Sequence, residues 1–251
     1  MTSTPIAYCG LAPTPDVLMG AWNLDPLLLA GLAALAWPVA RQAVRPGFAW
    51  AGWALAVLVF VSPLCNLTSA LFSARVLHHV VLTAAIAPLL VLGFGLPRRL
   101  ARQGAGGAMT AALLHAVAMW LWHAPGPYAW ALSSTGGYWL MQATLGATAL
   151  CLWAVILGAD PGASVTAAAA SFMQMGLLGA LIVFAAQPLY AAHLLTTEPW
   201  GMTALTDQRL AGLLMWVPAA GPYMAAIVIG VMALASDDDG AAEVAAGGRA
   251  A

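Results

Sequence analysis

The chain has 251 residues, of which 63% are hydrophobic and only 7% charged, and its formal net charge is −1. A soluble domain carries roughly 25% charged residues, so this composition predicts an integral membrane protein. All eight basic residues are arginines, which excludes a retinal protein with its Schiff-base lysine. The slight negative charge also argues against nucleic acid as a partner.

The N-terminal segment, residues 1–22, is a short proline-containing arm. It lacks the basic region followed by an apolar region that marks a cleavable signal peptide. We therefore expect an arm that lies on the outer side of the membrane ahead of the first span.

The rest of the chain is dominated by apolar runs separated by proline, glycine and arginine. A membrane-spanning helix needs about 20 mostly apolar residues. The runs predict an all-α bundle over residues 23–235, and the acidic, low-complexity tail at 236–251 is expected to be disordered. The predicted spans, about seven in number, are 24–40, 47–62, 71–95, 108–124, 139–158, 164–187 and 208–235.

The arginines predict the orientation of this bundle. Arg41 and Arg45 follow the first span, and residues 98–102 add three more arginines after the third. In a seven-span arrangement both connections lie on one side, which the positive-inside rule assigns to the cytoplasm. The N-terminus is then outside, the C-terminus is inside, and most histidines and other polar groups fall in the outer half of the bundle.

The third span begins with an unusual group of ionisable residues, Arg75, His78 and His79. Arg75 and His79 share one helical face with His78 beside them, and Thr83 extends that face inward. Ionisable side chains in a span are costly and usually functional, so we expect this face to point into the bundle. The alternative for Arg75 is that it extends to the lipid headgroups.

The fourth span carries His115, Met119 and His123 at intervals of four residues, on one stripe. Imidazole and thioether groups suit copper, although two histidines this far apart cannot hold one ion without help from another helix. The alternative is that Met119 packs in the core and His123 lies at the membrane interface with its tryptophan neighbours. His115 should lie nearer the middle of the membrane.

The last span opens with Thr206 and Asp207, either of which can cap the helix. Asp207 and Met215 fall on one stripe, whereas Arg209 points elsewhere. A carboxylate at this position suits metal binding or proton acceptance.

The cysteines, at 9, 65 and 151, form an odd set without a CxxC motif, so no disulfide framework can be read from them. Cys65, with Cys9, is a plausible soft metal ligand, and Cys151 is expected to pack inside an apolar span. No Walker A loop, HExxH motif or serine triad is present, so we expect no enzymatic activity.

Four segments of the chain carry a recognisable pattern: residues 62–93, WLWHAPGPYAWAL (120–132), QPLY (187–190) and DQRLAGLLMWVP (207–218), of which the last is the most specific. These segments resemble the CtaG-type assembly factors of caa-type cytochrome c oxidases. The resemblance supports His79, His123 and Asp207 as site residues. Many members have a histidine where this chain has Arg75, and a histidine-rich group where this chain has Tyr138 to Gln142.

The resemblance implies a non-enzymatic assembly factor in the bacterial cytoplasmic membrane. Its partners would be membrane lipids and haem–copper oxidase subunits or other assembly factors. It would act on the outer face, in copper delivery or subunit maturation, with copper as the expected cofactor. The candidate metal residues are His78, His79, His115, His123 and Asp207, with Arg75, Met119, Met215 and Cys65 as further polar or soft groups. The alternatives are a copper or proton transporter and a b-type haem protein.

Overall fold

The computed structural model describes residues 8–96, 105–158 and 160–247, except for the side chains of 105 and 237–247. Within these ranges helices are the only regular secondary structure, which confirms the predicted all-α class. The main helices are α1 (Pro26–Gln42), α2 (Pro46–Val61), α3 (Pro63–Ala70), α4 (Phe72–Val81), the π-helical η2 (Leu82–Ile86), α5 (Ala87–Gly93), α7 (Ala105–His123), α8 (Pro125–Ser133), α9 (Thr135–Ile156), α10 (Pro161–Phe184), α11 (Ala204–Trp216) and α12 (Ala220–Gly247). Short 3-10 turns are η1 (Leu18–Gly20), η3 (Ala191–His193) and η4 (Glu198–Trp200).

Helix starts follow local capping chemistry. The Asp25 side chain accepts hydrogen bonds from the first turn of α1, and the Asp160 side chain does the same for α10. Ser134 caps α9 and Thr203 caps α11. Each of these oxygens satisfies an amide that has no partner within its helix. The expectation that Thr206 or Asp207 caps the last span is wrong, because Thr203 fills that position.

Fewer helices are suited to cross a membrane than the seven spans predicted. Four described helical segments are long and apolar enough, namely 72–93, 135–156, 161–184 and 204–236. Helices α2 and α3 provide a fifth if counted together, although they are bent by 51° where Ser62 separates them. Helix α1 has 17 residues, or about 26 Å at 1.5 Å per residue, which is shorter than the ~30 Å hydrocarbon core.

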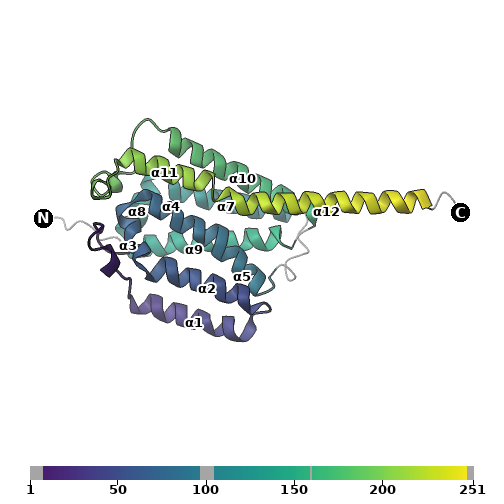
Figure 1. The fold of residues 1–251 in the computed structure, drawn as a ribbon, viewed down its shortest axis with the longest axis horizontal. Helices are drawn as coiled ribbons and strands as arrows, with labels where there is room; N and C mark the ends of the chain where they lie inside the picture. The colour runs from purple at the N-terminus through teal and green to yellow at the C-terminus, as the bar shows by residue number, and fades with distance from the viewer. Residues whose placement is uncertain (1–7, 97–104, 159, 248–251) are drawn as a thin grey trace.

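The segment expected as a disordered tail, 236–251, is described in part, by its backbone as far as Gly247. The backbone of α12 continues as helix to Gly247 and projects well past the other helices (Figure 1). This stretch is rich in alanine, the strongest helix former. Residues 248–251 lie outside the described part of the chain.

Helix α9 lies among the other helices, in contact with α5, α7, α8 and α10. Helix α4 packs against α11, and α10 packs against α7, α11 and α12. Helix α1 lies at the edge of the bundle and packs chiefly against α2 (Figure 1). These contacts bring the starts of α4 and α11 and the end of α7 to one end of the molecule.

That end is covered by segments that do not span the bundle. We call these segments the cap: the arm at 8–25, α3, α8 and the connection at 185–203. Trp200 of the connection donates from its indole nitrogen to the Pro13 carbonyl of the arm, at 3.1 Å. Asn66 of α3 donates to the Leu11 carbonyl at 3.0 Å. The predicted outer arm is therefore packed onto the protein over its described residues.

The cap contains a disulfide bond between Cys9 and Cys65. Its sulfur atoms lie near the Tyr138 hydroxyl, at 3.7 and 4.0 Å. The expectation that Cys65 is a free soft ligand is wrong, because its sulfur is bonded to Cys9 and carries no thiolate. Cys151, expected to pack within an apolar span, lies in α9 with its side chain exposed on the surface of the bundle. The pairing escaped sequence reasoning because 56 residues separate the two cysteines and only the folded arm brings them together.

Candidate functional site

The start of α4 is held by a carboxylate from another helix. Asp207 on α11 is fully buried and accepts hydrogen bonds from the Phe72 amide (2.7 Å), the Ser73 amide (3.1 Å) and the Ser73 hydroxyl. Leu71, which precedes α4, makes no side-chain cap. Asp207 thus performs the capping role across the helix interface, where its charge also suits the positive end of the α4 dipole. The contact fixes the position of α4 relative to α11.

His79 and His123 face each other across α4 and α7. Their ring centroids are 5.6 Å apart and the rings meet edge to face, with both side chains buried. His123 donates from Nδ1 to the Met119 carbonyl at 2.7 Å, so Nε2 carries its lone pair and has no partner. Among the described residues, neither ring nitrogen of His79 has a hydrogen-bond partner. The site therefore contains buried imidazole nitrogens whose lone pairs are not used inside the protein.

His78 and Arg75 extend this polar group along α4. His78 Nε2 lies 3.2 Å from the amide nitrogen of Gln142 on α9, which leaves Nδ1 without a partner. Arg75 is 1% exposed, and its guanidinium lies over the Tyr138 ring at 5.3 Å. Its one hydrogen bond runs from Nη2 to the Thr68 carbonyl, at 3.5 Å. The prediction that this face of the third span points inward is confirmed, and Arg75 does not extend to the surface.

The cap closes over these residues through aromatic side chains. Tyr190 stacks on Phe72 with centroids 3.8 Å apart and donates to the His123 carbonyl at 2.8 Å. Tyr128 donates to His193 Nε2 at 2.7 Å, and His193 Nδ1 donates to the Ala70 carbonyl at 3.2 Å. Both nitrogens of His193 are thereby used, so this histidine serves the structure of the cap.

Charge at the cap is set by burial and by Arg75. Burial lowers the pKa of His193 to about 4, the hydrogen bond to Ala70 opposes this, and the positive charge of Arg75 adds to it. Burial raises the pKa of Tyr128, and the Arg75 charge acts in the opposite direction. His193 is therefore neutral and Tyr128 is protonated at neutral pH, which agrees with the donor and acceptor roles above.

The remaining predicted site residues lie in different surroundings. His115 Nδ1 pairs with the Thr148 hydroxyl of α9 at 3.0 Å. Met119 and Met215 are buried in the hydrophobic core. The predicted stripe on the last span is confirmed, because Asp207 and Met215 are buried whereas Arg209 is exposed.

The structure gives no preformed metal cage in the part of the chain that it describes. No group of three or more His, Cys, Asp or Glu side chains is placed there to share one ion. Asp207 is directed at backbone amides, and His115 is bonded to Thr148. The groups left for a ligand are the open nitrogens of His78, His79 and His123, together with the unpaired Arg75.

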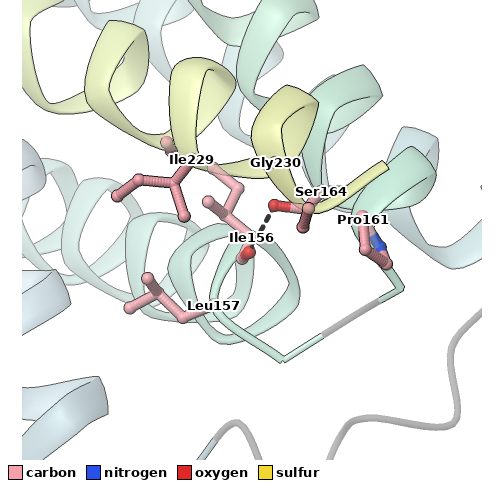
Figure 2. A pocket seen from close by; sticks show the side chains of 8 residues that line it. Ile156, Leu157, Pro161, Ser164, Ile229 and Gly230 are labelled. Carbon is pink, nitrogen blue, oxygen red and sulfur yellow. Dashed lines mark hydrogen bonds between the residues drawn. The ribbon is translucent and has the colours of Figure 1, made fainter. Parts of the chain in front are cut away.

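Two hollows on the bundle surface lie apart from this group. One, of about 540 Å³, lies between α1 and the bundle, with Phe60 and Trp139 in its wall. The other, of about 220 Å³, lies between the α9–α10 turn and α12 (Figure 2). In that second hollow the Ser164 hydroxyl donates to the Ile156 carbonyl at 2.6 Å and is not free for a ligand. Both hollows are lined mainly by apolar side chains.

Several residues of the site were not singled out by sequence reasoning. They are aromatic or amide side chains from distant parts of the chain: Phe72, Tyr128, Tyr138, Gln142 and Tyr190. Tyrosine and phenylalanine near the ends of membrane helices are expected at the interface in any case, so composition alone does not mark them. Gln142, an amide side chain within an apolar span, is the one that the sequence could have indicated as a site residue.

One comparison with known proteins identifies relatives of this chain. A model of the cytochrome c oxidase caa3 assembly factor family, Caa3_CtaG, matches residues 27–236. No curated protein matches the chain, and no solved structure matches it. The matched range contains the histidine pair, Arg75 and Asp207, and covers most of the chain. The chain belongs to the cytochrome c oxidase caa3 assembly factor family.

Proposed function

We propose that this protein assists the maturation of a caa3-type cytochrome c oxidase at the outer face of the bacterial cytoplasmic membrane, and that His79 and His123 bind copper during that process. Family membership supports the assembly role in general. The observation that carries the copper part is the facing pair of buried imidazoles with unused nitrogens.

The tautomer of His123 suits a metal ligand. Metal-binding histidines usually donate their second ring nitrogen to a carbonyl or carboxylate, which fixes the ring and directs the other nitrogen at the metal. His123 makes this bond to the Met119 carbonyl. Imidazole is a suitable copper ligand, and a pair of imidazoles fits the low coordination number that Cu(I) accepts. A site with only two ligands also suits an ion that must be passed on.

The remaining residues would position this pair. Asp207 fixes the start of α4 and so the height of His79 relative to α7. Tyr190 bonds the backbone of His123 and lies over Phe72. The cap would exclude water and restrict access until a partner subunit displaces it.

The proposal is tested by complementing a deletion strain with the wild-type chain, His79→Ala or His123→Ala. We expect the wild type to restore the haem spectrum and activity of the oxidase in membranes, and each variant to fail although it is present at normal levels. His115→Ala is the matched control, because His115 pairs with Thr148 outside the site. An oxidase that matures fully in the deletion strain would disprove the assembly role.

The copper part has its own measurement. Protein purified in detergent and loaded with Cu(I) should retain copper, and the double variant His79→Ala/His123→Ala should retain none above background. If wild type and double variant hold the same amount, the pair is not a copper site. The assembly role would then stand without it.

A further inference from the structure

Arg75 carries a positive charge in the interior without a described counter-charge. It is 1% exposed, and neither Nε nor Nη1 has a hydrogen-bond partner. Arginine remains protonated in proteins, and an ionised side chain in a bundle interior is expensive unless it is paired. The long hydrogen bond to Thr68 and the Tyr138 ring compensate only part of this cost.

The acidic residues of the chain are engaged elsewhere or lie far away. Asp16 accepts from Thr14, Asp25 from Tyr8, Asp160 from the α10 amides and Asp207 from α4, while Glu198 is exposed on the cap. The other four acidic residues are at 237–243, on the part of α12 that projects beyond the opposite end of the bundle (Figure 1). Over its described side chains, the protein thus supplies a buried cation and no acidic group paired with it.

We propose that Arg75 is the anchor of a binding site for a carboxylate group, with the hydroxyls of Tyr128 and Tyr138 as neutral neighbours. Charge-assisted hydrogen bonds from a guanidinium to a carboxylate are among the strongest in proteins, and unused N–H groups of Arg75 would donate to it. The inference stands independently of the copper proposal, because it rests on Arg75 and not on the imidazoles.

The position of Arg75 favours entry from the cap. Its guanidinium donates to the Thr68 carbonyl of α3. Its positive charge acts to lower the pKa of His193 in the 185–203 connection and the pKa of Tyr128 in α8. Tyr138 separates it from the Cys9–Cys65 disulfide. A carboxylate therefore reaches Arg75 by displacing cap segments, and the membrane helices need not separate.

The test uses thermal unfolding of the full-length chain in a neutral detergent at constant ionic strength. The probes are sodium formate, sodium octanoate and sodium chloride. A ligand that binds only the native state raises the midpoint temperature in a saturable manner. We expect formate or octanoate to do so for the wild type and for Arg209→Gln, the control in which an exposed arginine is removed, but not for Arg75→Gln.

Comparing formate with octanoate distinguishes the two possible sources of the bound carboxylate group. A response at lower concentrations of octanoate than of formate indicates a carboxylate on an apolar chain, and the reverse order indicates a small free anion; both support the site. If Arg75→Gln does not fold, Arg75→Lys replaces it in the test. We expect its affinity for the carboxylate probes to be reduced roughly tenfold or more, because lysine lacks the planar guanidinium fork. An equal response to chloride, an equal response in Arg75→Gln, or no response at all would overturn the proposal.

Discussion

At the scale of single residues, the protein uses its few polar side chains in two different ways. Asp207 and His193 have all or most of their hydrogen-bonding capacity filled by neighbours, so they stabilise the fold. Arg75, His79 and His123, in contrast, each have side-chain nitrogens without a hydrogen-bond partner among the described residues. Sequence reasoning placed all of these residues at one end of the bundle, but it did not distinguish the two roles, because hydrogen-bond partners come from distant segments.

Asp207 offers the first prediction at this scale. Replacing it with alanine leaves the Phe72 and Ser73 amides without acceptors, which should cost about 1–3 kcal/mol of stability for buried donors. Asp207→Asn keeps one acceptor oxygen, so its stability should lie between that of the wild type and that of Asp207→Ala. The midpoint of thermal unfolding measures this, with Arg209→Gln as the exposed control. A wild-type midpoint for Asp207→Ala would show that the hydrogen bonds from the start of α4 to Asp207 are dispensable.

His193 predicts a dependence of stability on pH. Its pKa in the folded protein is about 4, below the ordinary value of about 6.5, chiefly because it is buried. Between these values the unfolded state binds a proton that the folded state does not, so stability should fall as pH decreases from about 6.5 to about 4. His193→Gln should flatten this part of the curve. If the variant shows the same slope as the wild type, the slope arises from other groups.

At the scale of helices, contacts between backbones decide how the site is assembled. Helices α10 and α11 approach closely at Gly179 and Gly212, where a Cβ on Gly212 would lie 2.7 Å from the Gly179 carbonyl oxygen and 2.6 Å from a methyl group of Val183. This contact positions α11, and hence Asp207, within the bundle. A glycine in an apolar helix permits such a close approach, but the sequence does not identify the helix that it meets.

A matched pair of glycine substitutions tests the importance of that contact. Gly212→Ala must push the two backbones apart and should destabilise the protein by about 1–3 kcal/mol. Gly176→Ala places its Cβ 3.7 Å from the Trp216 indole, an ordinary contact, and should be neutral or slightly stabilising because alanine favours helix. Equal midpoints for the two variants would contradict this account of the α10–α11 interface.

The helix boundaries illustrate what an apolar run can and cannot predict. The run at 71–95 was expected as one span and is one helical segment, although it contains the π-helical turn η2. The Trp153 indole donates to the Thr83 carbonyl in that turn, at 2.8 Å, a partner supplied by another helix. The run at 47–62 continues into the bent α3, because Ser62 and Pro63 start a new helix at an angle. Hydropathy measures length and composition, and it does not measure direction.

At the scale of the whole molecule, the disulfide bears on the orientation, which stays a prediction. Disulfides persist in oxidising compartments and are rare in the cytoplasm, so the Cys9–Cys65 bond suits a cap on the outer side. Arg41 and Arg45 lie near the opposite end, as the positive-inside rule requires of the cytoplasmic side. The arginines at 98, 99 and 102 lie outside the described residues.

This orientation can be measured with a membrane-impermeant maleimide on intact spheroplasts. In a Cys151→Ser background we expect no labelling before reduction, because both remaining sulfurs are in the disulfide, and labelling of Cys9 and Cys65 after reduction. Cys9→Ser/Cys65→Ser is the unlabelled control. Labelling that requires permeabilised cells would place the cap in the cytoplasm and reverse the topology.

The same bond has a consequence for α1, which packs chiefly against α2. Because Cys9 precedes α1 and Cys65 follows α2, the two helices lie inside one covalent ring. Helix α1 can tilt or rotate within this ring, but it cannot diffuse away from α2 even when every contact between them is lost. A protease cut between Arg41 and Arg45 would leave one particle joined through sulfur, and the two fragments would separate only after reduction.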